Sequence, residues 1–225
     1  MRNYNLCTQL YKGARALLYH IALTLQQTDF SIRDEAAASL EEMQQALHLF
    51  NGYAWMEEKY MLPAIKKYSA EAVTIFKGAH EINVALSQQL KGLLQLLQQA
   101  STSRSRQDTG HAIIRAYTSF LAAKLEHLAI KEATLSTVLQ TYYTEQEVIG
   151  LQQTILNAIP VQHLAVYFRW IMRGSNNTEI INLLRYFEKT GTAQAIDLML
   201  QMLETELPVQ RWKNIQDKLA EGKVL

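Results

Sequence analysis

The stretch Tyr53-Ala-Trp-Met-Glu57-Glu58-Lys-Tyr-Met-Leu-Pro63 is echoed later in the chain as His127-Leu-Ala-Ile-Lys131-Glu132-Ala-Thr-Leu-Ser-Thr137. Each copy places a ring-bearing residue one helical turn before a charged pair, a spacing that lets one helix direct several polar groups into the same core. His20 and His80 stand alone on the segments before and between the copies. Imidazoles and carboxylates contributed by four helices are typical of a carboxylate-bridged metal site.

The composition bounds the class of protein. The 225-residue chain has a net charge of +1, and 48% of its residues are apolar, which predicts one sizeable core with room for a small second unit. Near-neutral charge without a basic stripe argues against a nucleic-acid partner. No apolar run predicts a membrane span or a secretory signal, so we expect no membrane partner and a cytoplasmic protein. Cys7, the lone cysteine, is expected to be a small buried residue.

Apolar residues recur every three or four positions, and no segment alternates with a period of two, so the sequence predicts an all-α fold. Four long helices with short links are expected to form an up-down-up-down bundle over residues 1–144. The first runs from about Tyr4 to Gln27. The second opens with a capping box of Ser31 and Asp34 and reaches Pro63, which kinks it or marks its last turns.

The third helix is expected to start near Ser69 and to turn one apolar stripe toward the core. That stripe consists of Ile75, Ala79, Ile82, Leu86, Leu90, Leu93 and Leu97. The polar run 100–109 is the least ordered part that the sequence predicts, and Asp108 is the expected cap of the fourth helix.

Residues 145–225 break into short amphipathic pieces. Thr144 with Glu147 and Asn176 with Glu179 form two further capping boxes. Short helices of this kind cannot bury their apolar faces alone, so we expect a helical appendage that packs on the bundle or on a partner. A protein partner or a homodimer through these C-terminal helices is therefore expected.

Two carboxylates fall in the middle of predicted apolar stripes, Glu58 on the second helix and Glu132 on the fourth. An unpaired buried carboxylate is costly, so each must meet a cation, a metal or a water-filled cavity. His20, His80 and His127 lie at the edges of their stripes. One such histidine is usually structural, but three on three helices, beside two core carboxylates, leave ligation and a structural role evenly balanced.

On these residues the chain resembles the hemerythrin-like, or HHE cation-binding, family over residues 1–145. The family phrase Glu-Glu-x-x-Leu-Phe-Pro stands here as Glu57-Glu58-Lys-Tyr-Met-Leu-Pro63. The resemblance implies a four-helix bundle that holds non-haem iron, with the ligands His20, Glu57, His80, His127 and Glu132. A helical wheel favours Glu58 where the family phrase favours Glu57, and both stay candidates.

Three positions depart from the family pattern. Tyr53 stands where the second-helix histidine is expected, Val84 replaces a second histidine on the third helix, and Lys131 occupies the carboxylate position four after His127. A cation beside iron is unfavourable, and Lys131 with Lys124 offers the carboxylates another partner. The site is therefore expected to have lost at least one metal ion.

Two functions follow from this pattern. The first is a metal-binding protein that carries one or two non-haem iron ions and senses or handles oxygen, nitric oxide or iron, with a small diatomic molecule as its ligand. The second is a metal-free helical interaction protein that has kept the bundle, lost the di-iron centre and docks through residues from 145 onward. No phosphate loop, Cys-x-x-Cys pair or nucleophile elbow occurs, so no enzymatic activity is expected.

Overall fold

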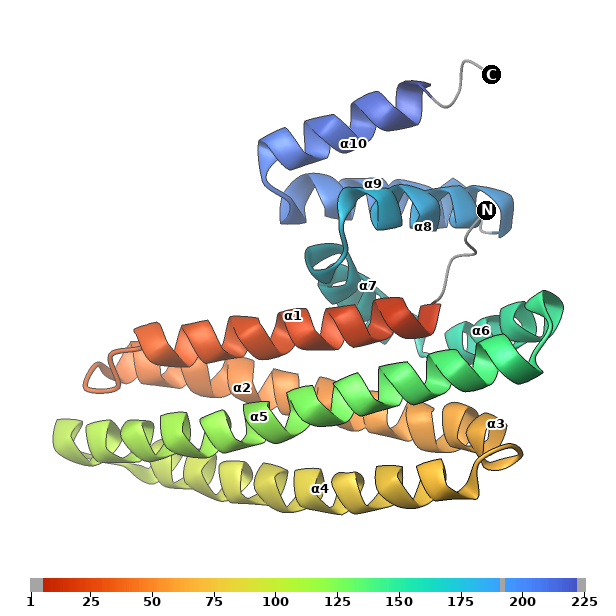
Figure 1. Ribbon diagram of the computed structural model, residues 1–225. Helices are drawn as coiled ribbons and strands as arrows, with labels where there is room; N and C mark the ends of the chain where they lie inside the picture. Colours follow the sequence, from red (N-terminus) through yellow and green to blue (C-terminus); the bar gives the residue numbers. More distant parts are fainter. Residues whose placement is uncertain (1–5, 191–192, 222–225) are drawn as a thin grey trace. The chain divides into compact units, whose positions relative to one another are not determined.

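The computed structural model describes residues 6–190 and 193–221, and these residues are almost entirely helical (Figure 1). No strand occurs in them, so the predicted all-α class is confirmed. None of the described helices is both long and apolar enough to cross a membrane. The elements are α1 (Leu6–Gln27), α2 (Arg33–Met56), the π-helical turn η1 (Glu57–Met61), α3 (Leu62–Lys66), α4 (Ala70–Gln99), α5 (Ser103–Tyr142), α6 (Glu145–Ala158), α7 (Val161–Gly174), α8 (Asn177–Thr190), α9 (Ala193–Glu206) and α10 (Val209–Glu221).

The helices group into two compact units. The larger comprises Leu17–Ile155, and the smaller combines the described residues up to Ala16 with those from Leu156 onward. Helix α1 therefore contributes its first part to the smaller unit and its second part to the larger. The division expected from the sequence, 1–144 and 145–225, stays a prediction. The predicted burial of Cys7 lies outside the described side chains.

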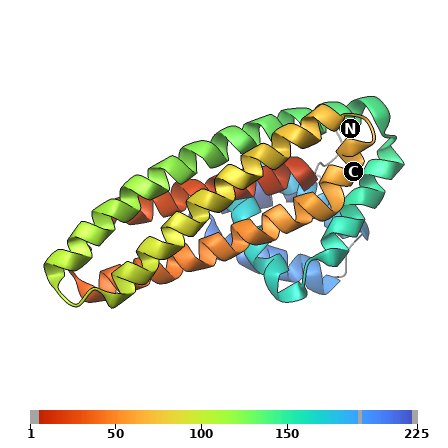
Figure 2. The same cartoon turned by 90° about the horizontal axis from the view of Figure 1, so that it is seen from below.

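In the larger unit, α5 packs lengthwise along α4, and α2 packs against both (Figure 1 and Figure 2). The second part of α1 joins them. The Tyr117 hydroxyl on α5 donates a 2.7 Å hydrogen bond to the carbonyl of Leu18, and His20 pairs with Glu42 on α2. The largest fully buried side chains of this unit are Leu17, Leu18, Ile21, Met43, Met56, Ile65, Leu90, Ile113, Phe120, Leu135 and Ile155.

Helix α4 buries Leu90 and Leu97, as predicted, but the rest of its buried face differs from the predicted stripe. Ile75 and Ile82, expected inside, are 47% and 58% exposed. The full set of residues that α4 buries is Ala72, Val73, Phe76, Asn83, Leu90, Leu94 and Leu97. Because α4 carries apolar residues on two faces, helical periodicity alone did not identify the one that packs.

Three of the predicted helix starts are confirmed. The Ser69 hydroxyl accepts a hydrogen bond from the backbone N–H of Ala72 and caps α4. Two predicted capping boxes also form, Thr144 with Glu147 at the start of α6 and Asn176 with Glu179 at the start of α8. In each box the side chain of the first residue accepts a hydrogen bond from the backbone N–H of the glutamate, and the glutamate side chain accepts one from the backbone N–H of the first residue.

Two other boundaries were predicted wrongly. No side chain caps α2, so the expected box of Ser31 and Asp34 does not form. Most of the run predicted to be the least ordered part of the chain is helical, because Thr102 and Ser105 make a capping box that starts α5 well before Asp108. The polar composition of this run therefore led us to miss the start of α5.

The smaller unit is built from the first part of α1 and helices α7 to α10. Helices α1 and α7 meet at small residues, where a methyl group on Gly174 would lie 2.5 Å from the carbonyl oxygen of Lys12. Lys12 also pairs with Glu179, and the Ser175 hydroxyl donates to the Gln9 side chain. Its most deeply buried side chains are Ile171, Met172, Ile180, Leu183, Leu184, Leu203 and Ile215.

Candidate functional site

Some of the polar groups singled out in the sequence, Glu57, Glu58 and His80, meet with Lys131 where α2 passes into η1. A π-helical turn holds one extra residue, rotates the residues that follow it and often occurs at functional positions. Here the turn begins at Glu57, which is buried, whereas the Glu58 side chain is 57% exposed. The family phrase therefore identified the inward carboxylate, and the inward placement of Glu58 by the helical wheel was wrong.

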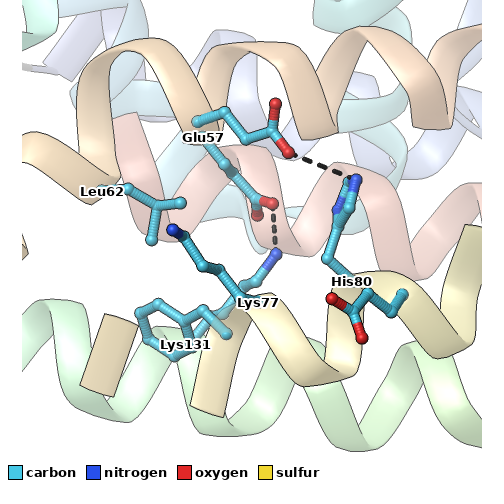
Figure 3. A pocket seen from close by; sticks show the side chains of 8 residues that line it. Glu57, Leu62, Lys77, His80 and Lys131 are labelled. Carbon is cyan, nitrogen blue, oxygen red and sulfur yellow. Dashed lines mark hydrogen bonds and ion pairs between the residues drawn. The ribbon is translucent and has the colours of Figure 1, made fainter. Parts of the chain in front are cut away.

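Glu57 forms a buried ion pair with Lys131 of α5, and Figure 3 shows the bond between them. The two side chains are only 12% and 8% exposed. The Lys131 ammonium also lies 6.0 Å from the centre of the Phe76 ring. Because both charges are withdrawn from water together, each depends on the other, and removing either one would leave an uncompensated charge in the core.

His127 lies one helical turn before Lys131 and is 3% exposed. The side-chain amide nitrogen of Asn83, on α4, donates a 2.8 Å hydrogen bond to the carbonyl of Ala79 and lies 2.8 Å from Nδ1 of His127. The Ala79 carbonyl fixes the orientation of the Asn83 amide. If the amide were turned over, its oxygen would face the carbonyl oxygen of Ala79 and the two would repel each other. The second amide hydrogen therefore points at His127, whose Nδ1 must accept it.

This hydrogen bond decides the chemistry of the imidazole. With Nδ1 as the acceptor, neutral His127 carries its proton on Nε2, and that atom has no hydrogen-bond partner among the described residues. Burial, reinforced by the charges of Lys131 and Lys124, lowers the pKa of His127 to about 3. A metal-binding histidine normally presents one nitrogen to the metal and donates from the other to an acceptor. His127 has an amide donor in that second place.

A second lysine enters the same region from α5. Burial lowers the pKa of Lys124 to about 8; the nearby Glu57 carboxylate opposes this shift, and the positive charge of Lys131 adds to it. The Lys124 ammonium lies 5.7 Å from the centre of the Phe50 ring, and no carboxylate pairs with it among the described residues. Two lysines thus lie near one buried carboxylate: Lys131 is buried and Lys124 is half-buried.

A pocket of about 250 Å³ opens next to the ion pair (Figure 3). At its outer part His80 Nε2 lies 3.3 Å from Glu58 Oε1, with side chains 30% and 57% exposed. The residues that line the pocket are Glu57, Glu58, Leu62, Phe76, Lys77, His80, Glu81 and Lys131. Of the six residues expected at the site, this pocket brings together Glu57, Glu58 and His80. His20, Glu132 and His127 are not among its lining residues.

The donor set does not fit a pair of iron ions. In the part of the chain that the structure describes, no three His, Cys, Asp or Glu side chains are grouped so that they could hold a metal ion. His20 pairs with Glu42, His80 pairs with Glu58, and Nδ1 of His127 accepts a hydrogen bond from an amide. Iron binding by these residues stays a prediction that this geometry does not support.

Sequence reasoning missed Asn83. Its signal was available, because Phe76, Asn83, Leu90 and Leu97 follow one another at seven-residue intervals on α4. A single polar residue in such a series predicts a buried hydrogen-bonding group. The series was overlooked because the neighbouring face of α4 is also apolar.

No family model matches this sequence, and no match was found among the curated proteins or the solved structures. The fold and the site therefore define the class: an all-α protein with a lysine–glutamate ion pair and a neutral histidine in the interior of its larger unit.

Proposed function

We propose that this chain is a metal-free relative of the hemerythrin-like proteins, in which an internal ion pair takes the place of the metal centre and the surface binds other proteins. In this proposal α1, α2, α4 and α5 are the four helices of an up-down-up-down bundle. The observation that carries it is the bond between Lys131 and Glu57. On the resemblance, both positions hold carboxylate ligands; here one is an ammonium bonded to the other.

Electrostatics supports this exchange. Buried carboxylates need a cation beside them, and in a metal centre the metal ion supplies that charge. Here the Lys131 ammonium supplies a positive charge next to Glu57, and it needs no set of coordinating ligands. An iron ion in that place would have to displace Lys131 from Glu57 and would then lie beside a buried ammonium. His127 offers no lone pair on Nε2 while Asn83 donates to Nδ1.

The exposed apolar side chains support a binding role. Three of them, Ile75, Ile82 and Leu96, lie on one face of α4 and are between 47% and 58% exposed. Contiguous exposed apolar residues on a folded protein are typical of a surface that binds another protein. In the interior of the larger unit, by contrast, the Glu57 carboxylate already has Lys131 as its partner.

Elemental analysis tests the proposal. The full chain is expressed with added iron, purified without chelators and analysed for iron and zinc. We expect well below one metal ion per chain and no charge-transfer absorption. One or two iron ions per chain would overturn the proposal. Loss of that iron in His127→Ala, but not in the exposed control His48→Ala, would then establish the metal-binding alternative.

A further inference from the structure

The outer face of α4 carries a series of residues that alternate three and four positions apart, which we call the α4 stripe. It consists of Ile75, Gly78, Ile82, Ala85, Gln89, Gly92 and Leu96, and all of these are exposed. This is the a/d spacing by which two helices pack along their length. The stripe holds no charged residue, although it faces solvent.

Two glycines of the stripe have no role in the packing of the chain on itself. A Cβ added at Gly78 or Gly92 would meet nothing within 4 Å. Glycine is the least favourable helix residue after proline, so two exposed glycines weaken α4 without improving any internal contact. Small residues on a helix surface do allow a second backbone to approach closely.

We propose that the α4 stripe binds the α4 stripe of a second copy of this chain, with the two helices antiparallel about a two-fold axis. In this register Ile75 faces Gly92 of the second copy, Ile82 faces Ala85, and Gly78 faces Gln89. Ile75, Ile82 and Gln89 each meet a small residue, whereas Leu96 lies beyond these pairs, opposite position 71 of the second copy. Each contact occurs twice, as a two-fold interface requires. The stripe is thus complementary to itself.

The alternative parallel arrangement lacks this complementarity. In register, it would set Ile75 against Ile75, Gly78 against Gly78, and the exposed Glu81 against Glu81. The antiparallel register instead offsets Glu81 from the exposed Lys91 of the second copy by about 7.5 Å along the axis, within reach of two long side chains of opposite charge.

The expected interface is small. The stripe from Ile75 to Leu96 is about 32 Å long and one helix wide, so the area buried falls below the roughly 1,200 Å² of standard stable interfaces. Association is therefore expected to be reversible at micromolar concentrations. This inference deepens the proposed function and rests on it for the role of the surface, but self-association is measured independently of metal content, so either can fail alone.

Sedimentation of the full chain over a concentration series tests self-association. The mass should rise from 25.7 kDa toward twice that value. Ile82→Glu places a carboxylate in the middle of the stripe and should weaken association at least tenfold. Leu23→Glu is a matched control, because Leu23 is 57% exposed on α1 and Ile82 is 58% exposed. A chain that stays monomeric up to hundreds of micromolar, or two variants that associate equally, would overturn the proposal.

Cysteine cross-linking tests the register. Chains with Ile75→Cys and chains with Gly92→Cys, each also carrying Cys7→Ser, are oxidised separately and as a mixture. Only the mixture should give abundant disulfide-linked dimers, because residue 75 of one copy lies about 25 Å from residue 75 of the other. Cross-linking of Ile75→Cys chains with each other would indicate a parallel pair and overturn the antiparallel arrangement.

Discussion

Two lysines on one face of α5 meet a single buried carboxylate, and this imbalance governs the interior of the larger unit. Lys131 bonds to Glu57, whereas Lys124 lies against the Phe50 ring with its pKa lowered to about 8. The same residue type on the same helix face therefore has two different roles. Lys131 compensates the buried charge of Glu57, whereas Lys124 makes no ion pair among the described residues and interacts with Glu57 only at longer range.

The same substitution should have a much larger effect at Lys131 than at Lys124. Lys131→Met leaves Glu57 buried without its cation and should lower the free energy of unfolding by about 3–5 kcal/mol. Lys124→Met removes a charge that has no ion-pair partner among the described residues and should change the free energy of unfolding by less than about 1 kcal/mol. Urea unfolding at pH 7 measures both. Adding Glu57→Gln to Lys131→Met should recover much of the loss; equal effects of the two methionine variants would contradict the assignment.

His127 should make the protein sensitive to mild acid. Its pKa is about 3 in the folded chain and near 6.5 when unfolded, so between these values the unfolded chain binds the additional proton. Stability should therefore fall as the pH falls from 6.5 toward 3, by about 2 kcal/mol between pH 7 and pH 5. His127→Leu should remove this contribution. Unfolding curves at the two pH values measure it, and equal pH slopes for the two proteins would refute it.

At the scale of helices, some glycines are required by close packing and others are not. A methyl group on Gly110 of α5 would lie 2.2 Å from the Phe30 ring, in the turn before α2, so this glycine allows two elements to touch. Gly150 of α6 has nothing within 4 Å of the same position. Sequence alone does not distinguish them, because both stand inside helical stretches.

Alanine substitution should separate these two glycines. Gly150→Ala should raise the free energy of unfolding by about 0.5–1 kcal/mol, since alanine is the better helix former. Gly110→Ala gains the same helix propensity, but its methyl group would force the Phe30 ring to move. We therefore expect the free energy of unfolding to fall by about 1–3 kcal/mol. Thermal unfolding of the two variants measures the difference. A stabilised Gly110→Ala protein would show that Phe30 moves at no cost.

At the scale of the whole molecule, the two ends of the chain build one unit. The first part of α1 supplies Lys12 to Glu179 and Gln9 to Ser175, and its backbone passes close to Gly174. The short C-terminal helices therefore depend on residues far away in sequence. This dependence is consistent with the expectation that such helices cannot bury their apolar faces alone.

Removing residues 1–16 should expose this dependence. The chain that begins at Leu17 should lose protection from proteolysis between residues 156 and 225, because the apolar face of α7 loses its cover. Residues 17–155 should keep their helical signal and their protection. Limited proteolysis with mass spectrometry measures both regions. Unchanged protection of the C-terminal helices would mean that they fold without α1.

Much of the helical architecture was predictable, and the errors have physical causes. The boxes at Thr144 and Asn176 are local, because their bonds join residues three positions apart, and both formed as expected. The inward carboxylate was misassigned because the helical wheel was centred on residues such as Leu40 and Ala54, which are only half-buried, whereas the buried Met43, Phe50 and Tyr53 share a face with Glu57. The outward face of α4 was misassigned because two of its faces are apolar.

The sequence by itself determined that the chain is helical, where several of the helices begin, and which polar residues had to be explained, because these follow from periodicity and from contacts within a helical turn. Only the tertiary structure decided how those residues are used. It paired Lys131 with Glu57, set Asn83 against His127 and left Ile75 and Ile82 outside. These outcomes depend on which helix faces meet, and no single helix carries that information.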